Sequence, residues 1–169
     1  LLGLGRERRF WALCLMSFLF SFSPFLGSAQ FYYQSEALKL GPVYIGVLST
    51  LGGAAGMAGA AFFAATIEKW STGRFLRSAV AISSAASLLY LLYVGPVAAG
   101  VLTVLFGFLG AALRLALMDL AAQSCPKHAE ATAFAVYMAV FNLAASASNM
   151  AGGALYERLR HDFAAAADP

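Results

Sequence analysis

Charged side chains are scarce in this sequence. Of its 169 residues, 11% are Asp, Glu, Lys or Arg and 61% are hydrophobic, and the mean hydropathy is +0.75. A water-soluble domain typically has about 25% charged and about 45–50% apolar residues. In water, such a chain would leave large apolar patches exposed. The composition therefore excludes a soluble domain with a single core and indicates a protein that lies in a lipid bilayer.

The residue types on which most enzymes and metal sites depend are also few. The only two cysteines, Cys14 and Cys125, lie in an apolar run and in a turn, so they indicate free thiols rather than a disulfide framework or a metal site. The sequence has no His-x-x-x-His pair, no paired acids inside an apolar run and no Gly-x-Ser-x-Gly motif. We therefore expect no enzyme activity, no catalytic residue, no metal and no cofactor.

Five apolar runs divide the chain, at about residues 10–33, 43–65, 75–93, 97–122 and 131–155. Each is close to the roughly 20 residues that a helix needs to cross the hydrocarbon core of a bilayer. The predicted fold class is an all-α integral membrane protein with five transmembrane helices. Residues 1–9 are expected to form a linker and residues 156–169 a polar C-terminal tail. Because the sequence starts without methionine, we expect it to be a piece of a longer protein.

The net charge of +3 comes from Lys and Arg in short loops rather than in one patch, so it predicts membrane orientation and no nucleic-acid partner. If the five spans alternate sides, seven basic residues fall on one side and three on the other. The seven are Arg6, Arg8, Arg9, Lys69, Arg74, Arg77 and Lys127, and the three are Lys39, Arg158 and Arg160. Basic loops prefer the cytoplasm, so the N-terminus is predicted to be cytoplasmic.

Polar or small residues recur at intervals of three and four in three of the runs, which places each set on one helix face. The sets are Ser17, Ser21, Pro24 and Ser28; Thr103, Gly107, Gly110 and Arg114; and Asn142, Ser146, Asn149 and Gly153. Pro24 also predicts a kink. Such a face either packs against another helix or lines a wet cavity, and the sequence leaves both readings open.

Six of these residues are candidate substrate-binding residues: Arg114, Asn142, Asn149, Ser146, Ser17 and Ser21. Glycines form a different pattern in the second run. Gly52, Gly56 and Gly59 are expected to be helix-packing residues, because small residues close together on a helix, such as the pair Gly52 and Gly56 four apart, let a second helix approach closely.

With the spans placed, the chain resembles the C-terminal half of a major facilitator superfamily transporter. The resemblance rests on a basic segment before the first span and on the charged turn 68–74, which is similar to a degenerate copy of the superfamily's acidic-x-x-Gly-Arg loop. It implies a six-helix half of which five spans are present, so that the partners would be the lipid bilayer, a missing N-terminal half and a missing last helix. It also implies alternating access, often with proton coupling.

A narrower resemblance is to the folate–biopterin transporter family. It rests on CPKHAEATAFA at 125–135, FNL at 141–143, FSP at 22–24, FYY at 31–33 and Gly46. It implies a folate- or pterin-like anion as the small-molecule solute. Arg114 would then bind a carboxylate of the solute, and Asn142 and Asn149 would form hydrogen bonds to its heterocycle. Ser17 and Ser21 would line the opposite wall of the cavity. Two alternatives stay open, a carrier or exporter of unrelated solutes and a non-transporting membrane scaffold half.

Overall fold

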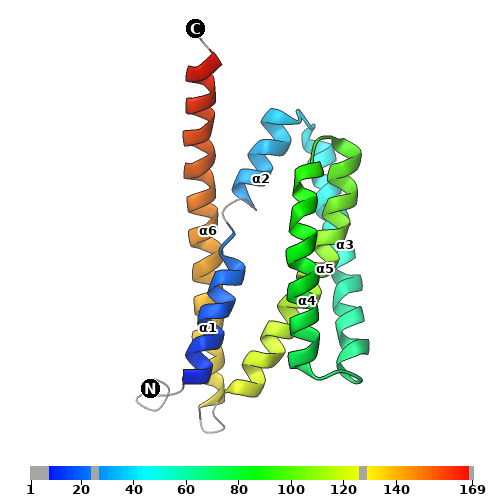
Figure 1. The fold of residues 1–169 in the computed structure, drawn as a ribbon, viewed down its shortest axis with the longest axis vertical. Coiled ribbons are helices and arrows are strands. Elements are labelled where there is room, and N and C mark those ends of the chain that lie inside the picture. The colour runs from blue at the N-terminus through cyan, green and yellow to red at the C-terminus, as the bar shows by residue number, and fades with distance from the viewer. Residues whose placement is uncertain (1–7, 24–26, 126–128, 168–169) are drawn as a thin grey trace. The chain divides into compact units, whose positions relative to one another are not determined.

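The structure is a computed structural model that describes residues 8–23, 27–125 and 129–167, with side chains up to residue 160. These residues form helices and no strand, as the sequence predicts (Figure 1). The chain divides into two compact units. Unit 1 combines Leu1–Ala37 with Ser124–Pro169, and unit 2 is Leu38–Gln123.

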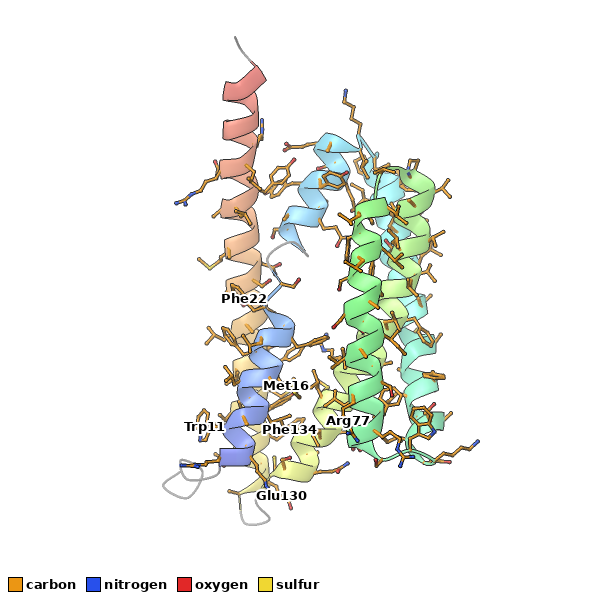
Figure 2. The ribbon with its side chains drawn as sticks, in the orientation of Figure 1. Trp11, Met16, Phe22, Arg77, Glu130 and Phe134 are labelled. Carbon is orange, nitrogen blue, oxygen red and sulfur yellow. The ribbon has the colours of Figure 1, made fainter. Side chains whose placement is uncertain are left out.

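Unit 1 contains α1 (Arg8–Ser21), α2 (Ser28–Tyr32), the π-helix η2 (Tyr33–Ala37) and the long α6 (Glu130–Ala167). Helices α1 and α2 both pack against α6. Figure 2 shows Trp11 and Glu130, near the first residues of α1 and α6, at the same end of the unit. The two helices therefore run parallel, and α2 lies beside a later part of α6 (Figure 1).

The first predicted span, 10–33, is not one helix. Helix α1 has 14 residues and ends at Ser21, residues 22, 23 and 27 are not helical, and α2 begins at Ser28. Two features of the sequence explain the interruption. Ser23 precedes a proline, which disfavours the helical conformation at Ser23, and Gly27 has a φ of 77°, a left-handed conformation that glycine adopts without strain. The serine face predicted through Ser28 is therefore interrupted, and the kink predicted at Pro24 lies outside the described residues.

Unit 2 consists of α3 (Pro42–Ile67), α4 (Thr72–Ser87) continued by the 3₁₀-helix η3 (Leu88–Leu92), and α5 (Pro96–Ser124). Consecutive helices run in opposite directions (Figure 1). Proline opens α3 and α5, a position where its missing N–H would have no helical partner anyway. Two apolar clusters hold the three helices together.

The first cluster joins α4 to α5 and has buried residues Phe75, Leu76, Ala112, Leu113, Ala116 and Leu117. The second joins α3, the end of η3 and α5, and has buried residues Leu48, Tyr93, Ala99 and Leu102. Leucine alternates with alanine in the α5 part of both clusters. The small residues let the neighbouring helices come close while the large ones fill the space between them.

In the described part of the chain, four helices are long and apolar enough to cross a membrane: Pro42–Ile67, Thr72–Leu92, Pro96–Ser124 and Glu130–Arg160. They match the second to fifth predicted runs within a few residues at most ends, whereas the count of five spans stays a prediction because the first run is broken. The exception is α6, which continues to Ala167 although we expected the span to end near residue 155 and a tail to follow. Its last part is rich in Ala, Leu, Arg and Glu, which favour helix even outside an apolar run.

Candidate functional site

Helix α6 has a polar face and a packed face. Asn142, Ser146 and Asn149 are all exposed, and their spacing places them within about 60° of one another around the helix. The residues on the packed face are Ala133, Tyr137, Phe141, Ala144, Ser148 and Gly152, all buried. The structure therefore brings three predicted site residues together on the open side of α6.

Ser17 lies on the buried side of α1. Its side chain has no exposed surface, and its hydroxyl donates a hydrogen bond of 2.9 Å to the Tyr137 hydroxyl of α6. Phe10, Leu13 and Cys14 share this buried side. Ser17 thus joins two helices, which corresponds to the packing alternative that the sequence left open.

Ser21 is the last residue of α1 and differs from Ser17. Its Oγ is buried but has no hydrogen-bond partner among the described residues. A buried hydroxyl without a partner costs free energy, so such a group favours a water molecule or a polar solute as its partner. Ser21 therefore keeps its place among the candidate solute contacts.

The interruption after α1 is fixed by two residues of α6. The backbone N–H of Ser23 donates to Ser148 Oγ at 3.0 Å. A Cβ on Gly27 would overlap the side-chain oxygen of Asn149. Ser23 and Gly27, which are both non-helical, thus contact α6 at consecutive positions, and Asn149 lies beside Gly27. Irregular backbone at membrane depth occurs where protein or a water-filled cavity surrounds it.

Arg114 belongs to unit 2. It is exposed on α5, between residues that pack on α4 (Ala112, Leu113 and Ala116). Arg114 and the polar face of α6 therefore belong to different units. Its charge lies within a helix apolar enough to cross the membrane, where an arginine costs about 2.5–3.5 kcal/mol on the insertion scale.

The three glycines of α3 face α5. A Cβ on Gly52 would lie 3.1 Å from the Thr103 side chain, and one on Gly56 would lie 3.6 Å from Ala111. At Gly59 the added atom would overlap the backbone oxygen of Phe108. These contacts bring two backbones close together, which is typical of small residues at a helix interface.

A second polar cluster joins one end of α4 to one end of α5. Thr72 Oγ1 donates to Asp119 Oδ2 at 2.6 Å, and Gln123 Nε2 donates to the same carboxylate oxygen at 2.7 Å. Gln123 also donates to Thr72 Oγ1 at 3.0 Å. The contact between Thr72 and Asp119 is not apparent from the sequence, because the two residues lie 47 positions apart in the chain.

A family model described as Major Facilitator Superfamily matches residues 2–149. The chain belongs to the major facilitator superfamily. Together with the four apolar helices, membership makes it an integral, multi-pass membrane protein that fits a membrane transporter.

Comparison with individual proteins adds no narrower relationship. No curated protein and no solved structure matches this superfamily member. The folate–biopterin resemblance therefore rests on the sequence motifs alone, and the solute is a matter for proposal.

The sequence reading missed several residues that shape this region, among them Tyr137, Ser148 and Gly27. Tyr137 and Ser148 had a recognisable pattern, because positions 133, 137, 141, 144, 148 and 152 follow intervals of three and four. The only sequence signals for the positive φ of Gly27 were the glycine itself and the nearby Pro24. Neither pattern says which partner helix the residues meet.

Proposed function

We propose that the chain forms part of a secondary transporter that works by alternating access and carries small organic anions of the folate or pterin class. The observation that carries the proposal is the exposed face of Asn142, Ser146 and Asn149 on a helix long enough to cross the membrane. An amide without a hydrogen-bond partner in hydrocarbon costs at least about 2 kcal/mol. Two amides on one face therefore favour contact with water, solute or a polar partner helix over contact with lipid.

The chemistry of these groups suits a heterocyclic anion. Each Asn carboxamide both donates and accepts hydrogen bonds, as a pterin ring requires. Arg114 would supply a charge-assisted pair for a carboxylate. Ser21, with its buried and unpartnered hydroxyl, would add a further polar contact. Ser17 is left out of this set, because its hydroxyl already binds Tyr137.

The choice of folate or pterin rests on the motifs at 125–135 and 141–143, which resemble those of the folate–biopterin transporter family. The motif at 141–143 contains Asn142 itself. Proton coupling would need a titratable group at membrane depth. Among the described residues, Asp119 and Glu130 lie near helix ends, so we place the coupling group in the remainder of the transporter.

We also propose that the N-terminus is cytoplasmic and that the complete transporter adds an N-terminal half and a last helix. The distribution of basic residues supports the orientation. With this orientation, the first residues of α1 and α6 lie at the cytoplasmic face, since the two helices run parallel.

The test is uptake of labelled folate and biopterin by proteoliposomes that contain the complete transporter. We would compare the wild type with Asn142→Leu, Asn149→Leu and Arg114→Ala. Met150→Leu is the matched control, because Met150 is exposed on α6 but apolar. Saturable uptake that the first three changes abolish and the control preserves would support the proposed anion site.

Other outcomes would favour the alternatives. Transport of other solutes, with no uptake of folate or biopterin, would make the protein a major facilitator carrier of a different substrate. Full activity of all three variants would remove the assigned residues from the site. A folded, reconstituted protein that moves no solute would support a non-transporting scaffold.

A further inference from the structure

A cavity of about 330 Å³ lies in unit 1 between α6 and the segment formed by α2 and η2. Its lining residues are Tyr32, Glu36, Gly153, Tyr156, Glu157 and Arg160. Ligand sites for small molecules start at about 300 Å³, so a small ligand would fill this space. The cavity lies beyond the polar face of α6 toward the C-terminal end of that helix, and the proposed transport site does not use any of its residues.

The charges around the cavity do not cancel. Glu36 is already engaged, because its carboxylate accepts a hydrogen bond from the Tyr156 hydroxyl at 3.3 Å and pairs with the Arg160 guanidinium at 3.4 Å. Glu157 has no ion pair among the residues whose side chains are described. Two carboxylates against one guanidinium leave one negative charge, which Glu157 carries.

Two aromatic rings form part of the same wall. Tyr32 and Tyr156 stack with their ring centres 5.5 Å apart and their planes 20° from parallel. The face of an aromatic ring is electron-rich and attracts a cation that sits over it. Gly153 lies three residues before Tyr156 on α6 and has open space beside it, since an added Cβ would meet nothing within 4 Å.

These features select one kind of ligand. An anion would meet the uncompensated Glu157. A divalent metal ion prefers six or more oxygen ligands, whereas no group of three acidic, histidine or cysteine residues suited to a metal occurs in the described part of the chain. An organic ammonium ion fits better, because its charge suits the carboxylate and its apolar groups suit the tyrosine rings.

We propose that this cavity binds a small organic ammonium ion. The cationic head lies between the Glu157 carboxylate and the tyrosine faces, and the apolar groups occupy the space that Gly153 leaves. The Arg160 guanidinium compensates the charge of Glu36, so that the net negative charge at the cavity comes from Glu157.

The experiment measures binding of radiolabelled choline to the purified protein in a non-ionic detergent by equilibrium dialysis. Detergent replaces lipid here because phospholipid head groups carry ammonium groups of their own. The neutral isostere 3,3-dimethylbutan-1-ol, which has the same shape without the charge, serves as a competitor. We expect saturable choline binding against which the isostere competes poorly.

Two charge variants are expected to change the Kd for choline in opposite directions. Glu157→Gln removes the uncompensated carboxylate, so the Kd should rise about tenfold. Arg160→Gln removes the competing cation and frees the carboxylate of Glu36, so the Kd should fall. A general loss of structure would weaken binding in both, so tighter binding in Arg160→Gln would separate the electrostatic effect from unfolding.

Two further variants complete the test. Gly153→Leu fills the cavity and should abolish binding, while Glu68→Gln, an exposed change in the other unit, should leave it unchanged. The proposal is overturned if the wild type does not bind choline, if the isostere competes equally well, or if Glu157→Gln and Glu68→Gln behave alike.

Discussion

The hydroxyl of Ser17 donates a hydrogen bond of 2.9 Å to the hydroxyl of Tyr137, and both side chains are fully buried between α1 and α6. The pair joins residues 120 positions apart in the chain. The sequence suggested Ser17 as a solute-binding residue, whereas in the structure its hydroxyl connects two helices. The consequence is measurable as a coupling between the two residues.

Ser17→Ala and Tyr137→Phe should each lower the free energy of unfolding by about 1–3 kcal/mol, because each leaves the other hydroxyl without this bond in a buried place. The double variant should lose less than the sum of the two single losses. Thermal unfolding of the four proteins in detergent would check this. Strictly additive losses would show that the bond does not couple the helices.

The contact between Thr72 and Asp119 gives a second prediction. Thr72→Val keeps the side-chain shape but removes the donor to the carboxylate, so stability should fall by about 1–2 kcal/mol. This is less than a fully buried charged bond contributes, because Asp119 is partly exposed. Ser71→Ala is the control, since the Ser71 side chain makes no capping bond to α4. Equal melting temperatures for the two variants would contradict the prediction.

Glycine positions on α3 should respond to alanine in opposite directions. Gly59→Ala should destabilise the protein by about 1–3 kcal/mol, because the new methyl group overlaps the Phe108 backbone. Gly53→Ala meets nothing within 4 Å and should be neutral or stabilising by up to about 1 kcal/mol, since alanine favours helix more than glycine does. Melting temperatures measured side by side test both. Similar losses at the two positions would argue against close packing of α3 on α5.

Gly27→Ala should reduce both stability and transport. The φ of 77° costs a non-glycine residue roughly 1–2 kcal/mol, and the methyl group would push the Asn149 side chain aside. Gly41→Ala is the matched control, because Gly41 has a φ of −65° and open space around it. Uptake and thermal stability would be measured on both. Unimpaired uptake in a folded Gly27→Ala protein would mean that transport does not require this placement of Asn149.

The reactivity of Cys125 should depend on Glu130. Burial, and then the nearby Glu130 carboxylate, raise the pKa of the Cys125 thiol above its ordinary value, since both disfavour the thiolate. In a Cys14→Ser background, maleimide labelling at pH 7.5 should therefore be slow and should accelerate as the pH rises. Glu130→Gln removes the negative charge and lowers the pKa, so labelling at pH 7.5 should become faster. Identical pH profiles with and without Glu130 would contradict this prediction.

The sequence by itself determined the helical fold class, the membrane location and most boundaries of four of its helices. These follow from local properties, namely the length of apolar runs and the places where proline and charge interrupt them. It also determined that Asn142, Ser146 and Asn149 share a face, since helical periodicity alone fixes that relation. The superfamily, too, is identified from the sequence, because its family model matches residues 2–149.

Only the tertiary structure decided which polar residues form hydrogen bonds or close contacts and which residues are their partners. Ser17 and Ser21 are one helical turn apart, yet one hydroxyl bonds to Tyr137 and the other has no partner among the described residues. Ser23 and Gly27 meet consecutive residues of α6 from the opposite end of the chain. Such pairings depend on the distance between helices that are remote in sequence. Periodicity within one helix carries no information about that distance, because it fixes only the direction in which each side chain points.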